Sequence, residues 1–228
     1  MTFHPLGDSA LTVDFADESS DRERLLARAL SAAERLEAAN VPGVIDVTCA
    51  YESVAVFFDP TRIEQDFEEK IGALVPSAGV RAPRRARKIE IPVCYDDEFA
   101  LDLPRVASQT LLTGEAVTAL HSSSEYTVAC VGFVPGFPFL AGLSEKLRVP
   151  RLESPRTKVP AGSVAIANAQ AGIYPFESPG GWNVIGRTPL RLFDTNAQSP
   201  ALLQPGDRVR FRRITRQEFE RSFKENWK

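Results

Sequence analysis

The stretch SPGGWNVIGRTPLRLFD, Ser178–Asp194, places two prolines, three glycines and a tryptophan directly around a strand-like run. Strands favour β-branched and aromatic residues, whereas glycine and proline weaken them. The cluster therefore predicts a loop with a demanding backbone shape. Loops of this kind either turn the corner of a β-barrel or bring backbone N–H groups close to a ligand.

The second half of the chain has the sequence texture of an all-β fold. Short strand-like runs, broken by Gly and Pro about every ten residues, are typical of a closed barrel or a sandwich. These runs are EYTVACVGF, KVPAGSVAIAN, AGIYPF, WNVIGRTPLRLFD and DRVRFRRI. Helices are predicted at LDLPRVASQTL, TGEAVTALHSS and TRQEFERSFKEN.

The first half alternates strands with amphipathic helices. ALTVDFAD alternates as a half-buried strand, and VIDVTCA and VAVFFD lie at hairpin spacing. A helix with apolar residues on one face follows the first strand, and another follows the hairpin. The order is β-α-β-β-α, and a strand at KIEIPVCY would complete the split β-α-β arrangement of a ferredoxin-like domain.

The two halves are separated by PSAGVRAPRRARK, which is rich in Pro, Gly, Ala and Arg and lacks apolar periodicity. We predict an N-terminal α/β domain at 1–80, a basic linker at 81–88 and a β-barrel domain at 89–228. A nucleic-acid-binding arm is the alternative for the basic segment, and a solvated linker is the better interpretation.

The composition is that of a globular protein, with 43% hydrophobic and 25% charged residues. A net charge of −3 gives no electrostatic footprint for nucleic acid. No apolar run approaches the roughly 18 residues that a membrane helix needs, and no signal peptide is predicted. The scattered cysteines Cys49, Cys94 and Cys130 lie in apolar runs. We expect reduced core thiols, a cytoplasmic location and no metal site.

The standard catalytic motifs are missing from the sequence. It contains no G-x-x-x-x-G-K-[ST], G-x-G-x-x-G, G-x-S-x-G or H-E-x-x-H. What remains is a set of Gly/Pro-rich loops within Gly132–Leu143 and Ser154–Leu190. Gathered at one mouth of a β-fold, they would suit a small polar or anionic ligand. The alternative is that the prolines and glycines only shape barrel corners and the aromatics fill the core.

Six segments together form a recognisable pattern. They are PLGDSALTVDF (Pro5–Phe15), LHS (Leu120–Ser122), GFVPGFPFL (Gly132–Leu140), SPRTKVPAGSVAIA (Ser154–Ala167), GIYPFESPGGWNVIGRTPL (Gly172–Leu190) and LLQPGDRVRF (Leu202–Phe211). The pattern resembles the KipI / PxpB family, whose members are B subunits of 5-oxoprolinase and are often labelled allophanate hydrolase subunit 1. The resemblance covers nearly the whole chain.

The resemblance implies an α+β fold, with an N-terminal ferredoxin-like α/β domain followed by a C-terminal cyclophilin-like β-barrel. It implies partner subunits of the PxpC/KipA type and of the LamB/YcsF type, PxpA. Together these would form an ATP-dependent 5-oxoprolinase that opens 5-oxo-L-proline to L-glutamate. ATP would bind at the assembled complex, this chain would be inactive alone, and no metal or prosthetic group is implied in it.

Two alternatives remain open at this stage. Other members of the family bind and inhibit a sporulation histidine kinase, so the chain could be a regulator. The same modules occur in the carboxyltransferase part of urea carboxylase, so the chain could also serve another amide-processing complex.

The implied reaction nominates site residues in the loops. A lactam is a poor electrophile, and the site must hold a carboxylate and a developing oxyanion, which arginine and backbone N–H groups can do. We predict Arg156 and Arg187 as catalytic charge stabilisers and His121 as the acid/base, with a helix-capping role as its alternative. The predicted substrate-binding residues are Gly136, Phe137, Ser163, Gln170, Tyr174, Ser178, Gly180, Gly181 and Trp182.

Overall fold

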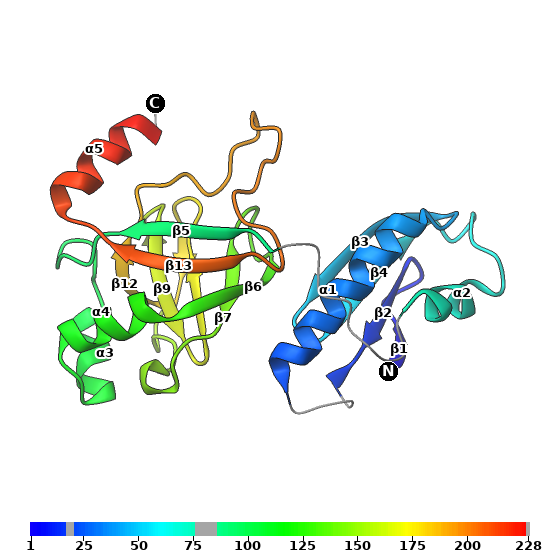
Figure 1. Cartoon of the computed structure of the whole chain (residues 1–228), viewed down its shortest axis with the longest axis horizontal. Helices are drawn as coiled ribbons and strands as arrows, with labels where there is room; N and C mark the ends of the chain where they lie inside the picture. Colours follow the sequence, from blue (N-terminus) through cyan, green and yellow to red (C-terminus); the bar gives the residue numbers. More distant parts are fainter. Residues whose placement is uncertain (17–20, 76–85, 227–228) are drawn as a thin grey trace. The chain divides into compact units, whose positions relative to one another are not determined.

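The computed structural model describes residues 1–16, 21–75 and 86–226, which form two compact units (Figure 1). The units are Met1–Ala86 and Arg87–Lys228. The predicted linker at 81–88 lies mostly outside the described residues. The domain boundaries of the sequence analysis therefore stay a prediction.

The first unit is a four-stranded antiparallel sheet in the order β1-β2-β4-β3, with two helices. Its elements are β1 (Thr2–Pro5), β2 (Ala10–Asp14), α1 (Arg22–Ala39), β3 (Val44–Ala50), β4 (Ser53–Phe58) and α2 (Phe67–Leu74). The Asp21 carboxylate caps α1 by accepting hydrogen bonds from the backbone N–H groups of Glu23 and Arg24. The helix then buries one leucine-rich face, including Leu26 and Leu36.

The β-α-β-β-α order is present, but the strand that completes the sheet is a different one. β1 pairs with β2 at the sheet position where the sequence analysis expects KIEIPVCY. KIEIPVCY instead supplies β5 (Lys88–Val93) of the second unit, which pairs parallel with another strand there. The expectation for KIEIPVCY was wrong because β1 already occupies that edge, while Ile91 and Val93 are buried in the second unit's core.

The second unit is a seven-stranded sheet in the order β12-β9-β10-β7-β6-β13-β5, with a two-stranded ribbon β11-β8. Six of these strands are labelled in Figure 1. Its further elements are α3 (Leu103–Thr110), α4 (Gly114–Ser123), β6 (Glu125–Val131), β7 (Pro138–Ala141), η2 (Glu145–Leu147), β8 (Arg156–Val159), β9 (Ser163–Ala167), β10 (Gln170–Ile173), β11 (Ser178–Gly180), β12 (Asn183–Arg187), β13 (Arg208–Arg213) and α5 (Arg216–Asn226).

The two edges of this sheet meet where Cys94, just after β5, bridges to Arg187 at the end of β12. Each residue's backbone N–H donates to the other's carbonyl over 2.9 Å. The sheet thus curls round on itself, and the predicted α+β class is confirmed. Among the described residues, no helix is both long and apolar enough to cross a membrane.

The sheet is buried on both faces at β9 and β12. Along β9, Val164 and Ile166 belong to the main core, whereas Ala165 and Ala167 belong to a second apolar cluster. The second cluster consists of Phe137, Val159, Ala165, Ala167, Tyr174, Trp182 and Val184. The P-G-F and P-G-G-W loops therefore cover the face of the sheet opposite the main core.

Candidate functional site

The turn Val159–Ser163, VPAGS, connects β8 to β9 and gathers several predicted site residues; we call it the VPAGS turn. Ser178 pairs with its first residue across the β8–β11 ribbon. Tyr174 is joined to its end by two backbone hydrogen bonds. The Gly162 N–H donates to the Tyr174 carbonyl over 2.7 Å, and the Tyr174 N–H donates to the Ser163 carbonyl over 2.9 Å.

Gly162 fixes the shape of the VPAGS turn. Its φ is 80°, a left-handed conformation that L side chains rarely adopt. A Cβ at this position would also collide with the Thr188 carbonyl oxygen. The Thr188 N–H donates to the Gly162 carbonyl over 2.9 Å, so the turn and the end of β12 are in direct backbone contact.

Arg187, the last residue of β12, lies opposite Ser163 in the β-ladder. Its Nε donates to the Ala161 carbonyl over 2.8 Å. The guanidinium carbon lies 5.7 Å from the centroid of the Phe219 ring and 5.2 Å from that of Phe223. Desolvation lowers the pKa of this half-buried arginine from its ordinary value. In the described parts of the chain, no carboxylate pairs with it.

Ser178 has a second polar group without a described partner beside the VPAGS turn. Its Oγ is buried and has no hydrogen-bond partner among the described residues. Buried hydroxyl groups are nearly always hydrogen-bonded, so an orphaned one invites an explanation. Ser178 and Arg187 thus border the same turn. The Ser178 hydroxyl is buried without a partner, and the terminal nitrogens of Arg187 have no acceptor, among the described residues.

Three aromatic rings pack behind this turn. The Phe137 ring is edge-on to Tyr174, at a centroid distance of 5.2 Å, and to Trp182, at 5.7 Å. Gly180 packs so closely on Tyr174 that a Cβ would collide with the phenol. Desolvation raises the pKa of Tyr174. All three rings are at most 5% exposed, so they fill a second core rather than wall an open pocket.

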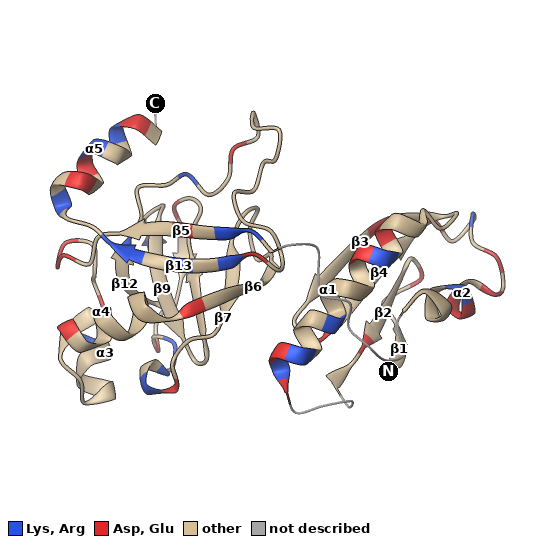
Figure 2. Cartoon of the chain, in the orientation of Figure 1, with Lys and Arg blue, Asp and Glu red and all other residues tan. Residues whose placement is uncertain are grey.

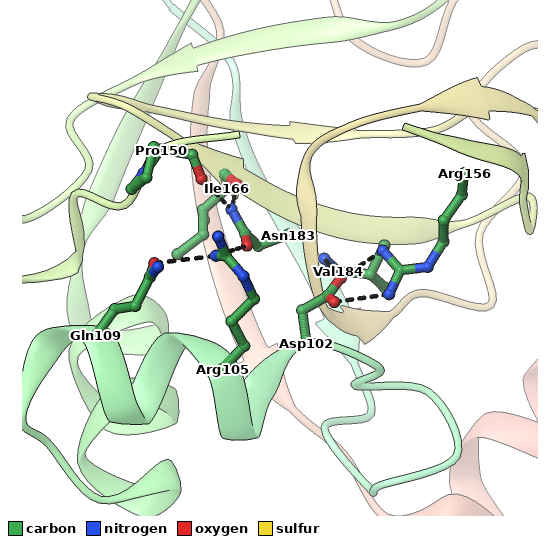
Figure 3. Close-up of polar contacts among 8 residues, drawn as sticks. All are labelled: Asp102, Arg105, Gln109, Pro150, Arg156, Ile166, Asn183 and Val184. Atoms are coloured by element: carbon green, nitrogen blue, oxygen red, sulfur yellow. Dashed lines mark hydrogen bonds and ion pairs between the residues drawn. The ribbon is translucent and has the colours of Figure 1, made fainter. Parts of the chain in front are cut away.

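The guanidinium of Arg156 is occupied by an ion pair with Asp102, which the sequence did not predict (Figure 3). Its two terminal nitrogens donate to the two carboxylate oxygens of Asp102, over 2.8 and 2.7 Å. Asp102 also accepts the Val184 N–H over 2.7 Å and is almost completely buried. Bidentate pairing of this kind fixes geometry, so Arg156 holds β8 and β12 to the start of α3. The predicted catalytic role for Arg156 does not fit this position.

Asn183 forms the second half of the same network (Figure 3). Its Nδ2 donates to the carbonyls of Pro150, over 2.9 Å, and Ile166, over 3.1 Å. Its Oδ1 accepts from Arg105 Nη1 over 2.9 Å, and the same nitrogen also donates to Gln109. The one available sequence signal was Asp102 ahead of Leu-Pro, which is typical of a helix start. The Asp102 side chain makes no cap, however, and pairs with Arg156 of β8 instead.

His121 lies in the main core rather than among the loops. It is fully buried on α4, and its Nδ1 is hydrogen-bonded to the Tyr95 hydroxyl over 2.8 Å. Its ring stacks on Phe211 at a centroid distance of 4.4 Å. Desolvation lowers the pKa of His121 to about 3, so the imidazole is neutral near pH 7. The predicted acid/base role does not fit this position, and neither does a capping role at the surface.

Gln170 is another predicted residue that lies apart from the VPAGS turn. It pairs with Ala167 at the tip of the β9–β10 hairpin, whereas Ser163 and Tyr174 lie at the opposite end of these strands. The remaining glycines lie in the covering loops. Gly136 packs against Phe193, and the Gly181 carbonyl accepts a backbone hydrogen bond over 2.7 Å.

Two cavities, each of about 370 Å³, border Asp96, which follows the Cys94 bridge in the chain. They share Asp96 and Arg213, and Asp97, Glu115 and Glu218 add further carboxylates. Arg213 is already paired with Glu115. One cavity has three carboxylates beside Arg213, and in the other Arg213 and Arg216 are balanced by two carboxylates. Neither offers the surplus of positive charge that a nucleotide triphosphate needs. In the part of the chain that the structure describes, no group of three or more His, Cys, Asp or Glu residues could hold a metal ion.

Comparison with known proteins assigns the family. The model for the carboxyltransferase domain, subdomain C and D, matches residues 1–203. The chain belongs to this carboxyltransferase C and D family. Its relatives include the 5-oxoprolinase B subunit of Bacillus subtilis, 39% identical over 94% of this chain and 93% of the relative. The same-named protein of Haemophilus influenzae is 54% identical over 56% of this chain and 60% of the relative.

The resemblance to the B subunits of 5-oxoprolinase is thereby confirmed. Among solved structures, this carboxyltransferase C and D chain is similar to TTHA0988, with 42% identity and a TM-score of 0.79. The match covers 90% of this chain but only 40% of that protein. The Kluyveromyces lactis urea carboxylase shares the fold, with a TM-score of 0.75 at 20% identity, over 98% of this chain and 22% of that one.

Proposed function

We propose that this chain is the B subunit of an ATP-dependent 5-oxoprolinase complex, which opens 5-oxo-L-proline to L-glutamate. The names of the Bacillus subtilis and Haemophilus influenzae relatives support the subunit role. The observation that carries the site is the Arg187 guanidinium, whose terminal nitrogens have no acceptor among the described residues. The Ser178 hydroxyl, buried and without a partner in the described chain, borders the same turn.

The proposed substrate matches these two groups chemically. It carries a carboxylate, and attack on its lactam carbonyl builds negative charge on oxygen. A fixed guanidinium with free N–H groups can bind either anion, and a hydroxyl can also donate to an oxyanion. Arg187 and Ser178 are therefore the proposed substrate-contacting residues. Gly162, Ser163 and Tyr174 shape the VPAGS turn that holds them.

The other requirements of the reaction fall outside this chain in our proposal. ATP would activate the lactam, which amide resonance otherwise protects. Neither cavity beside Asp96 has a surplus of positive charge for a triphosphate, so we place ATP at the assembled complex. The proposed partners are subunits of the PxpC/KipA and PxpA types, in the cytoplasm. We propose that this chain alone has no turnover.

Reconstitution tests this function. The purified chain, alone and with PxpC-type and PxpA-type subunits from the same organism, is incubated with 5-oxo-L-proline and ATP, and glutamate and ADP are measured. Turnover is expected only from the mixture. Robust turnover by the lone chain, or none by any mixture, would contradict the proposal. Replacing 5-oxoproline by urea, and adding a sporulation histidine kinase to the lone chain, tests the two alternatives in parallel.

A further inference from the structure

The C-terminal helix α5 places two aromatic rings over Arg187, and nothing so far explains why. We propose that Phe219 and Phe223 are positioning residues for an oxyanion site, in which the two terminal nitrogens of Arg187 bind a carboxylate or a phosphate. The proposal builds on the role of Arg187 in the proposed function. It can, however, be tested on the lone chain without any turnover.

The guanidinium of Arg187 has one hydrogen-bond partner and two aromatic neighbours among the described residues. The Ala161 carbonyl takes the Nε–H, and the phenyl rings of Phe219 and Phe223 lie over the group. The terminal nitrogens Nη1 and Nη2 have no acceptor among residues 1–16, 21–75 and 86–226. A planar fork with both outer N–H groups free matches the two oxygens of a carboxylate or phosphate.

Three other arginines of the second unit do have a carboxylate partner. Arg156 forms an ion pair with Asp102, Arg87 with Asp207 and Arg213 with Glu115. Arg187 is half-buried, yet its pKa is shifted by desolvation alone. A buried cation without a partner costs free energy, and aromatic faces offset only part of that cost. An incoming anion would supply the missing counter-charge.

Helix α5 is attached to the barrel through the same aromatic residues. Phe219 is 4% exposed and packs with Cys94 and Ile214, and its ring lies 4.4 Å from that of Phe99. The Phe223 ring stacks on Phe219 with an interplanar angle of 19°. The rest of the helix carries acidic and basic side chains (Figure 2). The two rings over Arg187 are thus its main apolar contribution.

The family match ends at residue 203, before helix α5 begins at Arg216. The site would therefore combine Arg187 and Ala161, which lie inside the matched region, with a helix that lies outside it. Differences in this helix between relatives would then tune how tightly the anion is held.

The test is anion binding by the full-length chain, measured by isothermal titration calorimetry, with the Arg187 Nε–H signal followed by NMR in the variants that keep this arginine. Inorganic phosphate and 5-oxo-L-proline are titrated separately, so that the two sources of an oxyanion are distinguished. We expect Arg187→Lys to weaken binding at least tenfold and Phe223→Leu to weaken it about threefold, because Leu keeps the apolar cover but removes the π-face. Phe223→Tyr restores the ring and should bind within about twofold of the native chain.

The matched control is Phe57→Leu, the same substitution at a partly exposed phenylalanine of the first unit. It should leave anion affinity unchanged. Native affinity in Phe223→Leu, or anion binding that does not depend on Arg187, would overturn the proposal. If the complex fails to turn over 5-oxoproline while the phosphate titration still shows the Arg187 and Phe223 effects, the proposed function falls and the oxyanion site stands.

Discussion

The two ends of β12 treat their polar side chains in opposite ways. At its start, Asn183 donates to two carbonyls and accepts from Arg105, so its amide is closed on both sides. At its end, Arg187 donates its Nε–H to the Ala161 carbonyl, and its two terminal nitrogens have no acceptor among the described residues. The contrast separates side chains that hold the fold from those available to a ligand.

The same contrast divides two residues of one type. Arg156 and Arg187 both lie in Gly/Pro-rich sequence, and the sequence predicts charge stabilisation for both. Asp102 neutralises Arg156, whereas aromatic rings cover Arg187. The two arginines therefore differ in the groups that surround them, a carboxylate in one case and aromatic rings in the other.

The largest effect is expected from Asp102→Ala. The substitution leaves the Arg156 cation unpaired and the Val184 N–H without an acceptor. We expect the free energy of unfolding to fall by about 3 kcal/mol. Chemical denaturation measures it, with the exposed neighbour Asp97→Ala as the control. If the free energy of unfolding falls no more than in the control, the contacts of Asp102 with Arg156 and Val184 do not stabilise the fold.

Arg187→Ala should leave the fold nearly intact and impair function. We expect kcat/KM of the assembled complex to fall about a hundredfold, equivalent to roughly 2.7 kcal/mol of lost charge stabilisation. Arg187→Lys should recover only part of this, because an ammonium lacks the planar fork. Melting temperature is recorded beside the kinetics. A large drop in melting temperature with normal activity per folded molecule would show that Arg187 stabilises the fold and does not bind the substrate.

His121 is an intermediate case, with Nδ1 closed by Tyr95 and Nε2 buried without a partner among the described residues. Its folded pKa is about 3, against 6.5 when exposed. Below pH 6.5, His121 is protonated in the unfolded chain but stays neutral in the folded chain. The free energy of unfolding therefore decreases as the pH falls from 6.5 towards 3. At pH 5 this amounts to about 2 kcal/mol.

The pH dependence of unfolding in His121→Phe tests this assignment. The phenyl ring keeps the stacking on Phe211 but cannot be protonated. The acid-side loss of stability should therefore be shallower than in the native chain by the amount attributed to His121. Identical curves for the two proteins would show that the imidazole is not held neutral by burial.

The smallest effect is expected from Ser178→Ala. Removing a buried hydroxyl that has no partner should raise the free energy of unfolding by about 1 kcal/mol. Ser53→Ala is the control, because that hydroxyl donates to the Ala50 carbonyl and its removal should bring no gain. A loss of stability in Ser178→Ala would reveal a structural role and remove Ser178 from the residues proposed to contact a ligand.

The sequence could predict the class of fold and the place of the unusual loops, because these depend on local signals. Alternating apolar residues marked the strands, and Gly and Pro marked the turns. Two of the glycines, Gly162 and Gly180, indeed lie where a Cβ would collide with a neighbour. The sequence could not say which sheet KIEIPVCY would join, since an alternating strand fits either one.

Partners distant in sequence were beyond the same reasoning. Asp102 and Arg156 are 54 residues apart, and no local pattern links them. His121 was nominated as an available imidazole, although its helix turns it into the core. Gln170 was nominated by its neighbours in the motif, although the hairpin carries it away from Tyr174. Of the predicted residues, Ser163, Tyr174, Ser178 and Arg187 do meet at one turn.

The pairing of β5 with β13 has a consequence for how the chain folds during synthesis. Arg87 and Asp207, which form an ion pair at the start of these strands, are separated by 120 residues. The ribosome must therefore deliver β13 before the second sheet can close, whereas every strand of the first unit has been made before β5 emerges. Long-range pairing is slow, and an open sheet exposes edges that associate with other chains. We expect the first unit to fold early and the unfinished barrel to depend most on chaperones.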